Sequence, residues 1–370
     1  MGELPNKMHG VLLTGHGGLD RLEVRSDIPV PRPGPHDVLI RVGAAAVNNT
    51  DINTRTAWYS KNDSASRDAS WTGEPIRFPL IQGADVCGRI VAVGEKISAD
   101  RIGKRILIEP CIREANSEVL KRPWYFGSEC DGGFAEYTVV SSQHAYEIDS
   151  KFSDIELASF PCSYSTAENM LSRSRVEEGD RILVTGASGG VGSAAVQLAK
   201  ARKAEVIAVT SPSKSNAVLN LGARKIVTRD DSVIEMLGRD SIDVVIDLVA
   251  GERWPEFLDV LRPGGRYAVA GAIGGPLVEL DIRTLYLKDL SFFGCTVLEP
   301  QIFSNLIKHI ESERVCPIVA EKFPLVQIVD AQKAFMSKKH IGKIVLSVNE
   351  NWRHKCSHKI DRYPLDTDIG

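Results

Sequence analysis

The stretch RILVTGASGGVG, residues 181–192, decides the fold. It has the pattern of an apolar strand, a tight turn of glycines and a helix that starts at Val191. Glycines in such a turn let the main chain approach a pyrophosphate, which the N–H groups and positive end of the helix can bind. The stretch therefore predicts a dinucleotide site, and a purely structural glycine turn is the alternative. The residues expected to contact the cofactor here are Gly186, Gly189, Gly190, Val191 and Gly192.

Around this turn, short apolar runs alternate with segments of helical periodicity. That alternation is typical of a doubly wound parallel sheet, so an α/β fold is expected for this part of the chain. The predicted strands are residues 181–186, 205–209, 225–227, 243–249, 266–271 and 291–297.

The first part of the chain has a different pattern. Residues 11–140 contain short β-type runs between glycines and prolines, which predicts a compact all-β unit. Residues 58–71 are polar and serine-rich between aromatic residues, and either a lid or an ordinary surface loop fits them. The last helices and the strand KIVLSV are expected to return to the first domain. The predicted division is residues 1–155, completed by 298–350, then 156–297, and a polar tail at 351–370.

The end of the second predicted parallel strand bears on the choice of cofactor. An Asp or Glu would bind the ribose hydroxyls of NAD there, but this chain has Thr210, Ser211 and Lys214. Hydroxyls and an ammonium group suit the 2′-phosphate of NADP(H), which a carboxylate would repel. The alternative is that Lys214 only begins a solvated helix.

Composition excludes several other classes of protein. The 370 residues are 43% hydrophobic and 25% charged with a net charge of −3, which argues against a nucleic-acid or membrane partner and favours a small-molecule substrate. No run of apolar residues is long enough to span a bilayer. The seven cysteines are widely spaced and form no CxxC, which indicates reduced thiols, no structural metal and a cytoplasmic location.

The order of motifs resembles one family. A β-rich first part, the GASGGVG turn, LRPGGRY and HIGKIVL resemble the medium-chain dehydrogenase/reductase superfamily over roughly residues 9–348. The resemblance implies a GroES-like β-rich catalytic domain, a Rossmann domain, a cofactor in the cleft between them, and a homodimer or homotetramer. It also implies that the main chain of Ala270, Gly271 and Ala272 faces the nicotinamide and that Lys343 approaches the pyrophosphate.

The resemblance also indicates where a catalytic zinc would bind. The ligand positions are occupied by Asn48, Ala84 and Cys162, and only Cys162 is a competent ligand. The four clustered cysteines of a structural zinc lobe are missing, so no metal is expected. A zinc alcohol dehydrogenase with Cys162 and Asp85 as unusual ligands is the alternative.

The segment VNNTD, residues 47–51, is similar to the NPxD segment of the zinc-free quinone oxidoreductase and enoyl reductase branch. Asn48 could donate from its amide and Thr50 from its hydroxyl to a substrate carbonyl, or both could satisfy main-chain groups at a strand end. Asn53 stands where that branch often has Tyr, so Tyr59 is a substitute proton donor. The predicted activity is NADPH-dependent reduction of an activated carbonyl compound, an enone or enal, or a quinone. A non-catalytic NADPH-binding protein is a further alternative.

Overall fold

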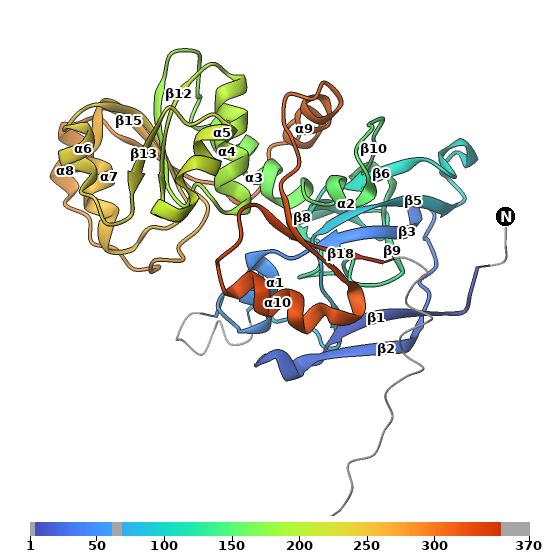
Figure 1. The fold of residues 1–370 in the computed structure, drawn as a ribbon. Helices are drawn as coiled ribbons and strands as arrows, with labels where there is room; N and C mark the ends of the chain where they lie inside the picture. The colour runs from blue at the N-terminus through green and yellow to red at the C-terminus, as the bar shows by residue number, and fades with distance from the viewer. Residues whose placement is uncertain (1–3, 61–68, 349–370) are drawn as a thin grey trace, which may run out of the picture.

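The computed structural model describes residues 4–60 and 69–348, which form two domains (Figure 1). The parallel-sheet domain holds six strands in the order β13-β12-β11-β14-β15-β16, and every neighbouring pair is parallel. The order reverses between β11 and β14, and a crevice at such a reversal is where open α/β sheets bind ligands. The strands are β11 (Arg181–Val184), β12 (Glu205–Thr210), β13 (Lys225–Thr228), β14 (Ile242–Asp247), β15 (Leu261–Val269) and β16 (Ser291–Gly294).

Both faces of the parallel sheet are buried. Along β11, Ile182 and Val184 belong to one hydrophobic cluster and Leu183 to another, because successive side chains of a strand point to opposite faces. This explains the continuous apolar run in RILV. The helices of this domain are α3 (Pro161–Arg173), α4 (Gly190–Ala201), α5 (Ser215–Leu221), α6 (Val233–Leu237), α7 (Trp254–Val260) and α8 (Ile282–Leu287).

The mixed-sheet domain is built from both ends of the chain. Its main sheet has the order β10-β6-β5-β3-β18-β17, with β9 also paired to β3, so strands from the last part of the chain lie beside a strand from the first. Figure 1 shows α10 beside α1, and Arg55 Nε donates to Gln332 Oε1 between them at 3.0 Å. The strands of this sheet are β3 (Asp37–Ala46), β5 (Asp85–Val93), β6 (Arg105–Ile108), β9 (Tyr137–Ser141), β10 (Ala145–Glu147), β17 (Val319–Pro324) and β18 (Lys343–Ser347).

Smaller elements complete this domain. They are the three-stranded sheet of β1 (Lys7–Leu13), β2 (Leu22–Pro29) and β4 (Leu80–Ile81), the hairpin of β7 (Cys111–Ala115) and β8 (Glu118–Tyr125), and α1 (Asn49–Arg55), α2 (Asp154–Leu157), α9 (Ile302–Glu311) and α10 (Ile328–Met336). Within residues 4–60 and 69–348, no helix has the length and apolar character needed to cross a bilayer.

The expectation of an all-β first part is wrong at one place that affects the site. The helix α1 begins directly after Asn48, where a strand end was expected. Asp51 Oδ2 accepts the main-chain N–H of Asn48 at 2.7 Å. The N–H groups at the start of a helix have no partner within the helix, and an acidic side chain in the first turn can accept one of them. Asn48 and Thr50, at the start of this helix, line a cavity together with the glycine turn after β11. Residues 61–68 of the predicted lid lie outside the described residues, and so does the polar tail.

Candidate active site

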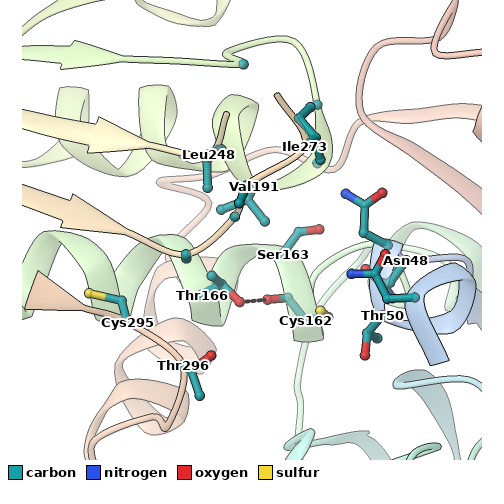
Figure 2. Close-up of a pocket in the computed structure, with 18 of the residues that line it drawn as sticks. Asn48, Thr50, Cys162, Ser163, Thr166, Val191, Leu248, Ile273, Cys295 and Thr296 are labelled. Atoms are coloured by element: carbon teal, nitrogen blue, oxygen red, sulfur yellow. Dashed lines mark hydrogen bonds between the residues drawn. The ribbon is translucent and has the colours of Figure 1, made fainter. Parts of the chain in front are cut away.

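A cavity of about 580 Å³ joins the glycine turn after β11 to the start of α1. Figure 2 shows Asn48 and Thr50 on one side of it and Val191 and Leu248 on the other, with Cys162 and Ser163 between. The predicted site residues that line it are Asn48, Thr50, Tyr59, Gly186, Gly189, Gly190, Val191, Gly192, Ala270, Gly271, Ala272 and Lys343. The residues predicted from separate sequence motifs therefore line the same cavity.

The turn between β11 and α4 is too tight for side chains. A Cβ on Gly192 would lie 2.3 Å from the carbonyl oxygen of Gly186, and one on Gly190 would lie 2.5 Å from Ser163 Oγ. Gly186 has a φ of +57°, in the left-handed region that glycine adopts without strain. The N-terminus of the twelve-residue helix α4 faces the cavity, as a pyrophosphate site requires. These residues fit a dinucleotide.

Asp247, at the end of β14, holds the adjoining main chain in place. Its carboxylate accepts the hydroxyl groups of Thr185 and Tyr267 at 2.5 Å each and the N–H of Val249 at 2.9 Å. This network ends the predicted strand 243–249 at Asp247, because the N–H of Leu248 donates to the Thr185 hydroxyl and those of Val249 and Ala250 donate to the carboxylate instead of a neighbouring strand. Its main-chain oxygen also accepts the N–H of Ala270 at 3.2 Å, which fixes the start of the segment expected to face a nicotinamide.

Thr210 ends β12, and Ser211 and Lys214 follow it at the same edge of the sheet, but none of the three lines the cavity. The Lys214 side chain is not simply solvated at the start of a helix. Its Nζ donates to the carbonyl oxygens of Lys338 and His340 at 2.7 and 2.8 Å. Burial, and to a smaller extent Arg229, lowers its pKa from the ordinary value. Sequence reasoning missed Lys338, whose pKa is lowered to about 8 by burial and then by the charge of Lys214, and whose Nζ donates to Asn49 Oδ1 at 3.0 Å.

The end of the cavity near α1 is rich in hydroxyl and aromatic groups. Tyr59 donates its hydroxyl to Thr50 Oγ1 at 3.2 Å, and burial raises the pKa of Tyr59, so the phenol holds its proton. The rings of Trp71 and Tyr125 contact each other with centroids 5.0 Å apart and a tilt of 33°, and Trp58 also lines the wall. Trp71 comes from a turn and Tyr125 from the end of β8, so neither segment alone could show that the two rings meet.

A buried ionic network lies beneath these groups. Asp85 Oδ2 pairs with Lys343 Nζ at 2.8 Å and accepts from Asn48 Nδ2 at 2.8 Å, while Asp85 Oδ1 accepts the N–H of Cys162 at 2.6 Å. Lys343 Nζ also donates to Asn48 Oδ1 at 2.5 Å. The side chain of Lys343 runs past the glycine turn, because a Cβ on Gly190 would lie 3.0 Å from its Cδ.

The residues at the zinc-ligand positions do not fit a metal. Asp85 is already bound by Lys343, Asn48 and a main-chain N–H, and the Cys162 thiol lies 2.9 Å from Tyr125 Oη. Burial, and then the charge of Asp85, raises the pKa of Cys162 to about 12, so the thiolate that zinc binds is disfavoured. Across the described parts of the chain, no group of three His, Cys, Asp or Glu side chains could hold a metal ion.

A parallel-sheet domain whose glycine turn faces a second, mixed-sheet domain defines the two-domain dehydrogenase class. A family model described as "Zinc-binding dehydrogenase" matches residues 190–312, and one described as "Alcohol dehydrogenase GroES-like domain" matches residues 34–150. The chain belongs to the medium-chain dehydrogenase/reductase superfamily. The predicted fold class and family are confirmed.

Individual relatives match this chain over nearly its whole length. A solved structure from Sinorhizobium meliloti 1021, described as a candidate alcohol dehydrogenase, is 43% identical with a TM-score of 0.87 and covers 93% of this chain and 97% of that one. Human quinone oxidoreductase is 29% identical over 353 residues, covering 92% of this chain and 97% of that protein. Acryloyl-coenzyme A reductase of Metallosphaera sedula is 27% identical, covering 92% and 100%. The chain is therefore similar to oxidoreductases.

Proposed function

We propose that this protein is an NADPH-dependent oxidoreductase that reduces an activated carbonyl compound, an enone or enal, or a quinone, without catalytic zinc. One observation carries the proposal: a single cavity runs from the glycine turn to the paired hydroxyls of Thr50 and Tyr59. A bound nicotinamide would supply a hydride to an acceptor in this cavity. The names of the human and Metallosphaera relatives lend support to an acceptor of this type.

The preference for NADPH is supported by the groups after β12. Thr210 and Ser211 carry hydroxyls, and the ammonium groups of Lys214 and Lys338 lie near each other, because the charge of Lys214 adds to the burial that lowers the pKa of Lys338 to about 8. A 2′-phosphate brings nearly two negative charges and pairs well with such cations. NADH offers only a hydroxyl at this place.

The acceptor binds, in this proposal, against the aromatic wall. Trp58, Tyr59, Trp71 and Tyr125 present ring faces and edges that suit a flat conjugated molecule. Tyr59 supplies a proton after reduction and regains it from solvent, and Thr50 holds the phenol in place through the 3.2 Å hydrogen bond. Asn48 acts by fixing Lys343 and Asp85 rather than by touching the acceptor.

The test is NADPH oxidation against a panel of quinones, enals and aldehydes, with the metal content of the same sample measured. We expect turnover that survives a chelator and a sample without stoichiometric zinc. One tightly held zinc per chain, with activity lost on its removal, would establish the alternative of a zinc alcohol dehydrogenase. Cofactor binding without turnover on any acceptor would establish the non-catalytic alternative.

The proposal includes a homo-oligomer. β16 is one of the two edge strands of the parallel sheet, and it carries the exposed Phe292, while the segment that precedes it holds Leu277 at 92% exposure and Leu287 at 69%. Exposed apolar clusters beside a free strand edge favour association with a second copy. The expected result of light scattering is a dimer or tetramer that Leu287→Arg dissociates, and a monomeric wild type would contradict it.

The proposed location is the cytoplasm. The described cysteines, Cys87, Cys111, Cys130, Cys162, Cys295 and Cys316, are all free thiols, and reducing compartments keep thiols in that state. A fluorescent fusion found outside the cytoplasm would contradict this location.

A further inference from the structure

The hydrogen bonds of Asn48 leave it without a donor for a substrate. Its amide has two N–H bonds, and Nδ2 donates to Asp85 Oδ2 at 2.8 Å and to the carbonyl oxygen of Ala46 at 3.3 Å. Its Oδ1 accepts from Lys343. Rotating the amide by 180° would place the NH₂ group against an ammonium and the oxygen against a carboxylate, so the network fixes this orientation. Another group must therefore polarise the acceptor.

Lys343 has the donor that Asn48 lacks. An ammonium carries three N–H bonds, and at most two of them are taken, by the hydrogen bond to Asn48 Oδ1 and by the ion pair with Asp85 Oδ2. For the third, the described residues provide no further hydrogen-bond partner, although the side chain lines the cavity. Lys343 is only 2% exposed, so bulk water does not surround its Nζ. A charged donor that is shielded from water interacts strongly with an anion that forms beside it.

We propose that Lys343 is a catalytic residue that donates its third N–H to the acceptor oxygen that becomes negatively charged. The inference rests on the proposed function and adds the electrophile that a zinc-free site needs. When hydride bonds to the electrophilic carbon of an enone or an aldehyde, the π pair moves onto the oxygen and gives an enolate or an alkoxide; reduction of a quinone by hydride gives the hydroquinone anion, whose charge also lies on oxygen. Lys343 stabilises this anion without giving up its proton, and Tyr59 or water then protonates the product.

Asp85 makes this arrangement stable before substrate arrives. A lone ammonium would be costly to bury, and the carboxylate of Asp85 compensates its charge at 2.8 Å. Asp85 is held in turn by the main-chain N–H of Cys162 at 2.6 Å. The ion pair thus holds one cation at the floor of the cavity with a donor left over, which is the arrangement that electrostatic stabilisation of an oxyanion requires.

The resemblance to the family implies a different partner for Lys343, the cofactor pyrophosphate. The stem of the side chain does pass Gly190, but the ammonium lies at Asn48 and Asp85. The two assignments predict different kinetics. A pyrophosphate ligand contributes to cofactor affinity, whereas an oxyanion donor contributes to the rate of hydride transfer at saturating cofactor.

The experiment compares wild type with three variants: Lys343→Ala, the double variant Lys343→Met with Asp85→Asn, and Lys322→Met. The double variant removes both charges and leaves no unpaired ion that could unfold the protein. Lys322 is an exposed lysine of the neighbouring strand β17 and is the matched control. NADPH dissociation constants are measured by fluorescence without acceptor, kcat and KM with a quinone or enone, and Lys343→Ala is assayed with and without propylammonium.

Both Lys343 variants should lose about 10²-fold or more in kcat, while the NADPH dissociation constant stays within about threefold of wild type. Propylammonium should restore part of the activity of Lys343→Ala, and Lys322→Met should behave as wild type. A dissociation constant raised about tenfold with kcat unchanged would overturn the proposal in favour of a pyrophosphate ligand. Unchanged kinetics, or no rescue by the amine, would also overturn it. If wild type itself reduces no acceptor, the proposed function fails and this role of Lys343 fails with it.

Discussion

The burial of Asp51 predicts how the free energy of unfolding changes with pH. The side chain is fully buried in the first turn of α1, and burial raises its pKa from 3.8 to about 7 against the opposing effects of the Asn48 N–H and Lys343. A carboxyl whose pKa is raised on folding stabilises the folded state below pH 3.8 and loses that contribution as the pH rises to 7. The substitution Asp51→Asn removes this loss, because an amide does not ionise.

The magnitude follows from the width of the interval. From 3.8 to about 7 is about three pH units, and at about 1.4 kcal/mol per unit wild type should lose about 4 kcal/mol relative to Asp51→Asn. The amide also carries a pH-independent cost of about 1–3 kcal/mol, because Oδ1 of Asp51 has no hydrogen-bond partner and an NH₂ group there would be unsatisfied. The pH slope of the difference, and not its absolute value, is therefore the test.

Urea unfolding at several values between pH 4 and pH 8 measures this slope. Trp58, Trp71 and Trp124 lie in the mixed-sheet domain and Trp254 lies in α7 of the parallel-sheet domain, so the measurement is made in a Trp254→Phe background. Asp27→Asn, in β2 of the same domain, is the control, because the hydrogen bond from Arg25 lowers the pKa of Asp27 and reverses the sign of its contribution. A stability difference between wild type and Asp51→Asn that stays constant over this pH range would refute the reasoning.

Three further predictions concern the site. Gly192→Ala should abolish NADPH binding in a fluorescence titration, because its Cβ would lie 2.3 Å from the Gly186 oxygen; binding of wild-type strength would count against the turn as the pyrophosphate site. Wild type should bind NADPH at least about tenfold more tightly than NADH, and Lys214→Ala should weaken mainly the NADPH complex; calorimetric titrations showing equal losses for both cofactors would contradict this. Tyr59→Phe should lower kcat by about 10²-fold with little change in cofactor affinity, and an unaltered kcat would remove Tyr59 as the proton donor.

Local patterns were sufficient to predict the parallel-sheet domain. The strand and helix in residues 181–192 follow from the periodicity of apolar side chains, and the turn between them requires glycine because a Cβ would clash there. Both signals lie within the segment itself. The ends of strands were less predictable. β14 stops at Asp247 because its carboxylate binds Thr185 from a neighbouring element and the N–H of Val249. No pattern along the strand itself encodes the first of these contacts.

The buried polar contacts beneath the cavity show which features could be predicted from the sequence and which could not. Asn48 and Asp51 have the spacing of a helix N-cap with an acid in the first turn, so α1 could have been predicted from that signal. The pairing of Asp85 with Lys343 could not, because it joins residues that are distant in the chain and meet only when β18 adds to β3. The same holds for the contact of Lys214 with the main chain at Lys338.

The most direct test of the central claim is the fate of hydride in metal-free protein. The chain, stripped of metal by a chelator and checked for zinc, is mixed with a quinone or enone acceptor and with NADPH deuterated at C4 of the nicotinamide on either face. With an enone, the account predicts deuterium on the electrophilic carbon of the product from one face only, at a rate that added zinc does not raise. With a quinone, it predicts stoichiometric NADPH consumption and hydroquinone formation. Transfer that requires zinc, or an absence of transfer to every acceptor, would contradict the account.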